Sequence, residues 1–372
     1  MHIQALRLLN YRNYNDLYVD FHKNLNILIG KNGQGKTNLI EAIYAFAFGK
    51  SFRTNKDKEL IKFNTDKAFL MGRIKREYYD DLLDIELLIS KNNSKGIKIN
   101  KLSLDKIANL IGKINVVIFS PEDLRLVKEG PKERRTFIDK ELSQIDPKYY
   151  NYIASYNKIL VQRNNLLKFK EFDSNLLNVY DEQLINLGSY IFFKRDEFIK
   201  RIAKISKEIH KGLTDSKEDL DILYSSNISK KAILDINLIK EEYKKLLKES
   251  LDVDIRRQNT KIGPHKDDLK VLINGIDARV YGSQGQQRTS SISIKLSQIE
   301  LINSIKNEYP IVLLDDIFSE LDEKRQSLLI NQLKDVQVFV TSAERNHEKI
   351  FNKKSCKVFY IEDGKILNSH SI

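Results

Sequence analysis

The sequence predicts an α/β fold in which a mixed sheet with an antiparallel subdomain is interrupted by a mainly helical inserted lobe. Short apolar or alternating runs, typical of strands, dominate residues 1–120 and return from residue 265 onward. Residues 121–264 instead carry apolar side chains at helical spacing, without heptads that continue for many turns. We therefore predict a head from residues 1–120 and 265–372, and a helical insertion from 121–264 with no long coiled coil.

The elements of the first region and of the insertion follow from the order of these runs. Turn-rich, charged segments separate the strands of the first region. These strands are predicted at residues 3–9, 17–21, 26–29, 68–74, 84–89, 97–102 and 114–119. The insertion is predicted to hold several helices of moderate length, with a short strand at 220–224 and a helix at 233–251.

Strand-like alternation resumes after the turn at Gly263 and Pro264. It predicts strands at 269–273 and 278–281, a loop at 282–288 and then a helix that ends near residue 305. The last elements are a buried strand at 311–314, a helix at 323–333, a strand at 336–340 and a hairpin around 363–364.

Composition excludes several classes of protein. Hydrophobic residues make up 41% of the 372 residues, and no run of about 18 apolar residues could span a membrane. The first residues lack the pattern of a signal peptide, so we expect a cytoplasmic protein without a membrane segment. Cys356 is the only cysteine, which excludes an intramolecular disulfide, and its apolar surroundings favour a buried strand thiol.

The formal charge of +12 suits a polyanionic partner such as nucleic acid. Part of this excess reflects general composition, because Lys outnumbers Arg and both Ile and Asn are abundant. The six histidines show no metal-ligand pattern. Mg²⁺ held by oxygen ligands is therefore the only metal that the sequence implies.

Residues 30–37 match G-x-x-x-x-G-K-[ST], between an apolar strand and a helical pattern. This context is that of a loop that binds the phosphates of a nucleoside triphosphate, because its glycines let successive N–H groups point at phosphate oxygens. We expect Lys36 to reach the β and γ phosphates and Thr37 to bind Mg²⁺. The predicted ATP-binding residues of this phosphate loop are Gly30, Lys31, Asn32, Gly33, Gln34, Gly35, Lys36 and Thr37.

Two acidic residues, Asp315 and Asp316, follow the apolar strand at 311–314. The carboxyl end of such a strand emerges beside the phosphates, so we expect Asp315 to hold Mg²⁺. Asp316 is expected to orient or deprotonate the attacking water, in a reaction that depends mostly on positioning and charge stabilisation. Apolar strands that end in Asp are common, and the assignment gains support from the sequence Ser-Glu-Leu-Asp at 319–322 and from residues 283–287.

Most of the chain, including the helical insertion, separates Lys36 from Asp315. That arrangement resembles the ATPase heads of the ABC/SMC superfamily. In that superfamily a loop of serine, glycine and glutamine begins a helix and meets the γ-phosphate of the nucleotide that the other subunit holds. A similar segment, which we call the signature loop, stands before the acidic strand and offers a second anion site, although an ordinary polar helix cap is the alternative. It comprises Ser283, Gln284, Gly285, Gln286 and Gln287.

Four groups of residues, spread in one order over nearly the whole chain, narrow the resemblance. Together they resemble the DNA replication and repair protein RecF family, whose length without coiled-coil arms also fits. The groups are Asn10-Tyr11-Arg12-Asn13-Tyr14, Ser120-Pro121-Glu122-Asp123-Leu124 with Gly130-Pro131 and Arg134-Arg135, Gly263-Pro264-His265-Lys266-Asp267-Asp268, and Ser283-Gln284-Gly285-Gln286-Gln287.

The resemblance implies an ATP-dependent DNA-binding protein of recombinational repair, replication restart and the SOS response to DNA damage. It implies a weak DNA-stimulated ATPase with ATP and Mg²⁺ as cofactors. By the same resemblance, an ATP-induced homodimer of heads would bind DNA at gaps and duplex junctions, act with RecR and RecO, and be released by slow hydrolysis. Arg12 and Asn13 would lie near the nucleotide, and Ser283 would act on the nucleotide of the other subunit.

Two positions depart from the general ABC pattern. Asp316 stands where transporters have Glu after the metal-binding Asp, and Thr341 follows the strand at 336–340 where transporters have a switch His. We therefore expect slow hydrolysis, and the role of Asp316 as a base stays open.

Basic residues of the insertion have two interpretations. Lys132, Arg134 and Arg135 either contact DNA phosphates or form a solvated helix face paired with acids. Arg256 and Arg257 either contact DNA or, as we favour, stabilise a helix C-terminus.

Other polar and aromatic residues of the insertion are interpreted structurally. His265 is expected to be a turn residue hydrogen-bonded to its neighbours rather than a contact of the domain junction. The aromatic run at 149–152 is expected to be part of a core rather than a platform for bases.

Two functions of other classes compete. A transporter ATPase subunit is disfavoured by the missing switch His and by the large helical insertion, and stimulation by DNA would discriminate. An ATP-gated nuclease of the overcoming-lysogenisation type needs a further acidic metal-binding domain after the head, and few residues follow the acidic strand. An SMC-like structural protein is excluded by the absence of arms.

Overall fold

The computed structural model describes residues 1–92, 95–169, 171, 173–318, 323–333, 335–343 and 355–371. The chain divides into two compact units, of which unit 1 comprises Met1–Asp123 and Gln298–Ile372 and unit 2 comprises Leu124–Ser297. Residues 265–297, which we expected in the head, thus belong to unit 2. The reason is strand pairing, because β10 (Asp268–Ile273) pairs with β9 (Leu220–Ser225) of the insertion.

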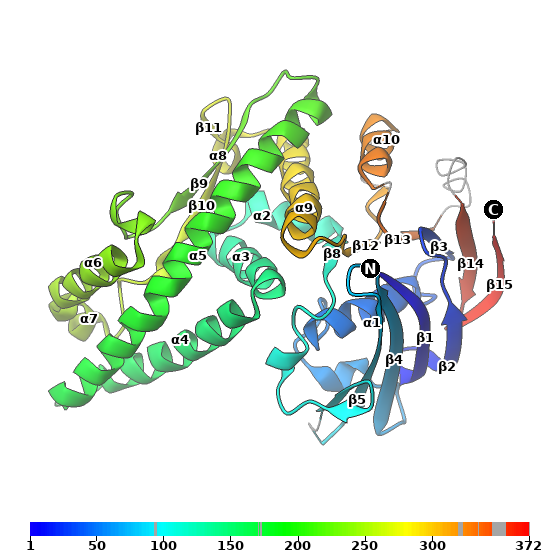
Figure 1. The fold of residues 1–372 in the computed structure, drawn as a ribbon, viewed down its shortest axis with the longest axis horizontal. Coiled ribbons are helices and arrows are strands. Elements are labelled where there is room, and N and C mark those ends of the chain that lie inside the picture. The colour runs from blue at the N-terminus through cyan, green and yellow to red at the C-terminus, as the bar shows by residue number, and fades with distance from the viewer. Residues whose placement is uncertain are drawn as a thin grey trace. The chain divides into compact units, whose positions relative to one another are not determined.

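Unit 1 contains two six-stranded sheets among its described residues. The first is antiparallel and has the order β2-β1-β4-β5-β6-β7, with its early strands in blue in Figure 1. Its strands are β1 (His2–Tyr11), β2 (Tyr14–Asp20), β4 (Lys67–Arg76), β5 (Asp81–Ser90), β6 (Lys95–Ile99) and β7 (Leu102–Ser103). These strands confirm the predicted antiparallel subdomain.

The second sheet has the order β15-β14-β3-β13-β12-β8 and is parallel except for the β14–β15 hairpin. Its strands are β3 (Leu25–Ile29), β8 (Val116–Phe119), β12 (Ile311–Leu314), β13 (Val338–Ser342), β14 (Cys356–Glu362) and β15 (Lys365–Ser371). The central strands are buried on both faces, which explains their continuous apolar sequences. Cys356 is buried in β14, as predicted.

Helix α1 (Lys36–Phe48) contacts strands of both sheets, namely β4 of the first and β8 and β13 of the second. Its residues are buried on nearly every side, so it is part of the core that the two sheets share. The ring of Phe46 lies so close to β4 that an added Cβ at Gly72 would come within 2.7 Å of it. The other short helices among the described residues of unit 1 are η1 (Asp57–Leu60), η2 (Ile107–Asn109), η3 (Pro121–Leu124), whose last residue belongs to unit 2, and α10 (Glu323–Gln332).

Unit 2 is mainly helical and contains a three-stranded antiparallel sheet of order β11-β10-β9 among its described residues. The short strand expected at 220–224 is present as β9. The third strand is β11 (Ile276–Asp277). The described helices are α2 (Arg125–Lys128), α3 (Pro131–Ile145), α4 (Pro147–Leu166), α5 (Ser174–Thr214), η4 (Ala232–Leu234), α6 (Ile236–Glu249), α7 (Leu251–Arg257), η5 (Pro264–Lys266) and α8 (Ala278–Tyr281). Helix α9 (Gln284–Lys306) begins in unit 2 and ends in unit 1.

The expectation of helices of only moderate length was wrong for α5, a single helix of 41 residues that is the long green helix of Figure 1. Gly188 lies inside this helix without breaking it. An added Cβ at Gly188 would come within 2.7 Å of the Tyr243 ring, so the glycine is a site of close packing. The helix pairs with α4 and α6 of its own unit and forms no long coiled-coil arm.

The strand expected at 278–281 is instead the short helix α8. Asp277 caps it, since its carboxylate accepts a hydrogen bond from the Arg279 N–H at 2.8 Å. In the described part of the chain, no helix is long and apolar enough to cross a membrane.

Candidate nucleotide-binding site

The phosphate loop follows β3, and its last two residues, Lys36 and Thr37, begin α1, as the motif requires. Gly35 has φ 118°, a conformation that L side chains rarely adopt. An added Cβ there would also come within 2.8 Å of the Asn13 side chain. Tyr14 Oη donates a hydrogen bond to the Gly35 carbonyl at 3.0 Å, which fixes the loop where the helix begins.

Gln34 receives contacts from both ends of the chain. Asn13 Nδ2 donates to its carbonyl at 2.9 Å, and the Gly364 N–H donates to the same carbonyl at 3.0 Å. The Asp363 N–H donates to the side-chain Oε1 at 2.6 Å. The turn between β1 and β2 and the turn between β14 and β15 therefore hold the middle of the phosphate loop together.

Lys36 lies over the loop, with its Nζ donating to the carbonyls of Gly30 at 2.5 Å and Lys31 at 2.9 Å. Burial lowers the pKa of Lys36, whereas the nearby carboxylates of Asp316 and Asp315 raise it. A partly desolvated ammonium bonded to loop carbonyls is suited to exchange these neutral acceptors for phosphate oxygens.

Three neighbouring strands bring Thr37, Asp315 and Thr341 together. Strand β13 lies between β3 and β12, and Thr341 is its last residue but one, near the ends of β3 and β12 from which the phosphate loop and Asp315 follow. Asp315 Oδ1 accepts hydrogen bonds from Thr37 Oγ1 and from Thr341 Oγ1, both at 2.9 Å. Burial raises the pKa of Asp315, and these two hydrogen bonds oppose the rise.

The expected Mg²⁺ ligands, Thr37 and Asp315, therefore lie within hydrogen-bond distance of one another. Hydroxyl and carboxylate oxygens are the donors that Mg²⁺ prefers, so this pair fits the ion. Asp316 is exposed and has a positive φ of 52°, which Asp tolerates better than most residues. The Asp316 N–H donates to Thr341 Oγ1 at 2.9 Å, so Thr341 contacts both Asp315 and Asp316. Thr341 is the residue that stands where ABC transporters have a switch His.

Thr37, Asp316 and Thr341 line a cavity of about 330 Å³, whereas Asp315 is not among its lining residues. Sequence reasoning missed Asn38, Arg53 and Thr341 as lining residues, although Asn38 directly follows the motif. Arg53 Nη1 donates to Asn38 Oδ1 at 2.9 Å, which places a second cation beside Lys36 in the lining. The cavity is lined by Asn32, Gly33, Gly35, Lys36, Thr37, Asn38, Arg53, Asp316 and Thr341.

Arg12 and Asn13 do not line this cavity. Arg12 forms a two-pronged ion pair with Glu41 of α1, in which Nε and Nη2 donate to the two carboxylate oxygens at 2.8 and 2.7 Å. Glu41 is fully buried and also accepts from Ser51 Oγ at 2.5 Å. Arg12 thus fixes α1, and Asn13 supports Gln34.

The signature loop lies in unit 2 and begins α9. The Ser283 N–H donates to Gln286 Oε1 at 2.9 Å, and the Gln286 N–H donates to Ser283 Oγ at 3.2 Å. This reciprocal pair is a capping box. The Gln287 side chain is buried and donates to the Ala278 carbonyl at 2.9 Å, which ties the loop to α8. The residues at 319–322 lie outside the described residues.

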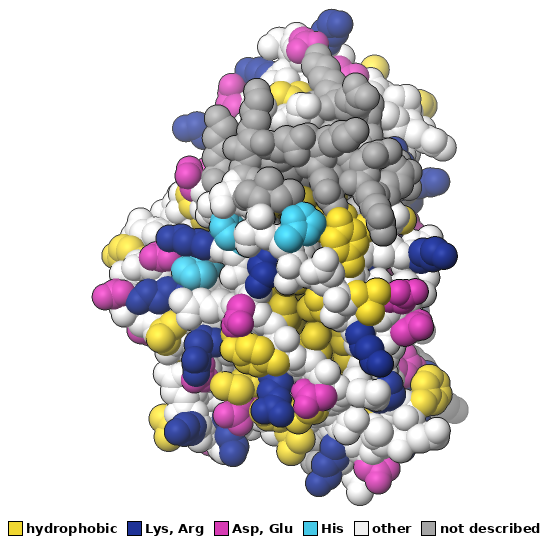
Figure 2. All heavy atoms as spheres, turned by 90° about the vertical axis from the view of Figure 1, so that its right-hand side faces the viewer, with side chains coloured by type: hydrophobic (Ala, Val, Ile, Leu, Met, Phe, Trp, Pro, Cys, Tyr) yellow, Lys and Arg dark blue, Asp and Glu magenta, His cyan; other side chains and the backbone are white. Residues whose placement is uncertain are grey.

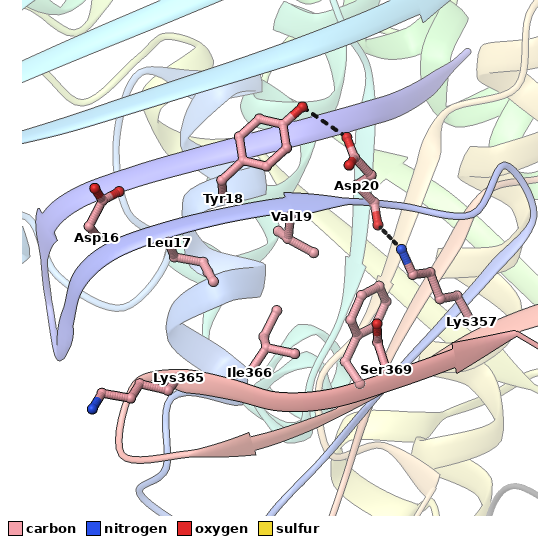
Figure 3. A pocket seen from close by; sticks show the side chains of 10 residues that line it. Asp16, Leu17, Tyr18, Val19, Asp20, Lys357, Lys365, Ile366 and Ser369 are labelled. Carbon is pink, nitrogen blue, oxygen red and sulfur yellow. Dashed lines mark hydrogen bonds between the residues drawn. The ribbon is translucent and has the colours of Figure 1, made fainter.

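A second cavity of unit 1, of about 520 Å³, lies between β2 and the β14–β15 hairpin. Figure 3 shows Leu17, Val19 and Ile366 pointing into it, and Lys357 Nζ donating to the Asp20 carbonyl. None of the predicted site residues lines it.

On the face that Figure 2 shows, Lys and Arg side chains alternate with Asp and Glu, and the described residues form no continuous basic stripe there.

The basic residues at the start of α3 have structural partners, which neither interpretation anticipated fully. Arg134 is buried and donates from Nε and Nη2 to the Asp268 carboxylate at 2.6 and 3.0 Å. Arg135 Nη1 donates to the Asp267 carbonyl at 2.7 Å. Lys132 is exposed. Two of the three cations thus hold α3 to the segment before β10.

His265 is confirmed as a turn residue, since its Nε2 lies 3.0 Å from the Thr260 carbonyl and its Nδ1 lies 2.8 Å from Tyr156 Oη. Burial lowers the pKa of His265 to about 4. Tyr149 is fully buried, as expected of a core aromatic. Arg256 and Arg257 lie in the last turn of α7, where positive charge interacts favourably with the negative end of the helix dipole.

Comparison with known proteins shows the family of this chain. The family model of the RecF/RecN/SMC N terminal domain matches residues 2–366. A DNA replication and repair protein RecF from Clostridioides difficile (strain 630) is 53% identical over 371 residues, which cover 99% of this chain and 98% of the relative. This chain belongs to the RecF family. Another RecF, from Alkaliphilus oremlandii (strain OhILAs), is 46% identical over 366 residues, which cover 98% of this chain and 100% of that relative.

Solved structures of RecF agree with the fold. A structure of the recombination mediator protein RecF-ATPrS in the RecFOR pathway has a TM-score of 0.91 at 34% identity, covering 98% of this chain and 97% of that one. A structure of RecF-ATP in the same pathway has a TM-score of 0.89 at 34% identity, and the match covers 100% of this chain and 99% of that one. An Smc head bound to the C-winged helix domain of ScpA shares the fold, with a TM-score of 0.58 at 16% identity over 100% and 98% of the two chains.

Membership in the RecF family places this chain among DNA replication and repair proteins of the SMC type of ATPase head. ATP binding and, in general, ATP hydrolysis belong to this class of head. The predicted family resemblance and the predicted fold class are thereby confirmed.

Proposed function

We propose that ATP joins two copies of this chain into a dimer that binds DNA at single-strand gaps and their duplex junctions. The nucleotide would lie between the phosphate loop of one copy and the signature loop of the other. The single observation that carries this proposal is that Asp315 accepts hydrogen bonds from Thr37 and Thr341, which line one cavity together with Lys36. Slow hydrolysis of ATP would release the dimer, and DNA would stimulate it weakly.

The residues of the cavity have separate roles in this proposal. Lys36 neutralises the phosphates and Asn13 keeps Gln34, and so the loop, in place. Bound Mg²⁺ would stabilise negative charge on the phosphates, with Thr37 and Asp315 as its protein ligands. Asp316 orients the attacking water, and Ser283 of the second copy supplies a hydroxyl and the N-terminus of α9.

The biological setting follows from the relatives. The solved RecF structures are of proteins in the RecFOR pathway, so we propose that this chain acts in the cytoplasm with RecR and RecO in recombinational repair. Against a transporter subunit, Thr341 bonds Asp315 in the place of the switch His.

Sedimentation of the full chain with ATP, ADP or no nucleotide, each with and without gapped duplex DNA, tests the proposal. We expect a dimer in ATP that DNA stabilises. The Ser283→Arg variant should bind ATP as tightly as the wild type and stay monomeric, because a bulky cation would occupy the place of the small hydroxyl. A Ser283→Arg variant that still forms dimers in ATP would contradict the role of the signature loop.

A further inference from the structure

The signature loop is joined to the end of α5 by a short series of polar contacts within unit 2. Gln286 uses its side-chain oxygen to accept from the Ser283 N–H, which leaves its amide nitrogen Nε2 free to donate elsewhere. That nitrogen donates to Glu218 Oε1 at 2.9 Å. Glu218 lies in the short segment between α5 and β9.

The second oxygen of Glu218 contacts α5. Oε2 of Glu218 lies 3.3 Å from His210 Nε2, and His210 is fully buried near the C-terminal end of that helix. His210 Nδ1 lies 3.0 Å from Ser293 Oγ of α9. Gln286 and Ser293 are two turns apart on one face of α9, so Glu218 and His210 fasten that face at two points.

The chemistry of Glu218 decides how the Gln286 amide is oriented. An ionised carboxylate only accepts hydrogen bonds, whereas a Gln side chain has one end that donates and one that accepts. Glu218 therefore attracts the NH₂ end of Gln286 and leaves the oxygen directed at the Ser283 N–H. If the amide turned over, the capping box would lose its acceptor and the Gln286 NH₂ would face the Ser283 N–H.

We propose that Glu218, supported by His210, is a positioning residue that sets the signature loop for its contact with the nucleotide of a second copy. This inference rests on the proposed function, since it concerns the same ATP-dependent dimer. Glu218 touches neither the phosphate loop nor the acidic strand in the contacts above and acts through Gln286. The neutral amide Glu218→Gln keeps the shape of the side chain but can present either end to Gln286.

The test compares Glu218→Gln with Glu197→Gln in the full chain. Glu197 is a suitable control because it is also a partly exposed Glu of unit 2, and its own partners, Lys194 and Arg201, lie on α5. We expect Glu218→Gln to bind ATP with wild-type affinity and to form the ATP-dependent dimer about tenfold more weakly, since a hydrogen bond to a charged acceptor is replaced by an ambiguous neutral one. Glu197→Gln should match the wild type in both measurements.

A rescue variant separates positioning from a merely structural role. In Glu218→Gln combined with Gln286→Glu, the carboxylate at position 286 accepts both from the Ser283 N–H and from the new amide at 218, as in the commonest capping box. We expect dimerisation to recover in this double variant. Hydrogen exchange of the amides at 283–287, measured without nucleotide, should be faster in Glu218→Gln than in Glu197→Gln.

The outcomes distinguish the two proposals. A wild-type chain that stays monomeric in ATP overturns the proposed dimer and this inference with it. A dimerising wild type together with normal dimerisation and normal exchange in Glu218→Gln overturns the inference alone. Equal loss of dimerisation in the single and double variants would also reject the positioning role, because the carboxylate would then have no specific partner in Gln286.

Discussion

Asp315 of unit 1 and Asp267 of unit 2 are both buried, and burial raises the pKa of each carboxyl group. Their hydrogen-bond donors differ in charge. Asp315 accepts from two neutral hydroxyls, those of Thr37 and Thr341. Asp267 Oδ2 accepts from the Arg195 guanidinium at 2.9 Å and from Tyr224 Oη at 2.5 Å. The charge of the first carboxylate is therefore open to compensation by a bound cation, whereas the second already has a cationic hydrogen-bond donor in Arg195.

The same contrast extends through unit 2. Arg195 bridges Asp139 and Asp267, and Arg163 bridges Asp181 and Asp254, with both guanidinium groups almost wholly buried. Such buried pairs are costly to break because the remaining partner is left charged and desolvated. We infer that the buried charges of unit 2 hold its helices in place, whereas the buried charge of Asp315 serves ligand binding.

The largest expected effect tests the structural half of this contrast. Arg195→Met should lower the free energy of unfolding by about 3–5 kcal/mol, because Asp139 and Asp267 lose their shared cation. ATP affinity at low temperature, where the variant is folded, should stay at the wild-type value. Urea unfolding and nucleotide titration measure the two quantities. Arg201→Met, which removes an exposed cation of the same helix, is the control. If both variants lost a similarly small amount of free energy of unfolding, the structural role assigned to the buried charges of unit 2 would be wrong.

The next effect tests the functional half. Asp315→Asn should reduce Mg²⁺-dependent ATP hydrolysis on the order of 100-fold, as expected when one electrostatic group of an active site is removed. The nucleotide-free protein should unfold no more easily than the wild type, because the neutral amide avoids the desolvation that raises the pKa of Asp315. Asp84→Asn in β5 serves as control. A clear loss of stability with unchanged hydrolysis would reverse the assignment.

The smallest effect concerns pH. Burial raises the pKa of Asp267 to about 7 in the folded state, whereas the ordinary pKa of an aspartate, which applies in the unfolded state, is near 4. Between these two values the folded protein holds a proton on Asp267 that the unfolded chain has released. This contribution to stability is full at low pH and is lost as the pH rises toward 7. Between pH 5 and pH 7 it should amount to about 2 kcal/mol. We expect the wild type to lose that much more stability than Asp267→Asn over this range, measured by urea unfolding.

Buried histidines work in the opposite direction, which is why the difference between the two proteins is the quantity to compare. Burial lowers the pKa of His265 to about 4, so its contribution is lost as the pH falls. This term is common to both proteins. Parallel pH profiles for the wild type and Asp267→Asn would show that Asp267 stays ionised in the folded state.

Local patterns in the sequence predicted much of the head. The phosphate loop, the strand before Asp315 and the antiparallel strands depend on neighbours in the chain, and each forms where its pattern lies. The failure at 278–281 is also local, because a cap at Asp277 outweighed an alternation of only four residues. The length of α5 was missed because the spacing of apolar residues predicts a helix without showing where one helix ends and the next begins.

Pairings between distant residues could not be predicted in this way. Arg134 and Arg135 carry no sign in the sequence that they contact Asp267 and Asp268, far along the chain. The same holds for Arg53, which reaches the cavity from a loop without a motif. Charged residues in a helix look alike whether they face solvent or a buried carboxylate, so only the assembled fold separates the two.

The contacts on Gln34 also bear on the order in which this protein becomes functional during its synthesis. The chain is made from its N-terminus, so the phosphate loop exists long before the turn at Asp363 and Gly364 whose N–H groups bind it. Gly364 has φ 70°, and an added Cβ there would come within 2.4 Å of the Asn13 carbonyl, so this turn closes tightly over the loop. The final geometry of the phosphate loop is thus a property of the finished molecule, and a nascent chain on the ribosome lacks it.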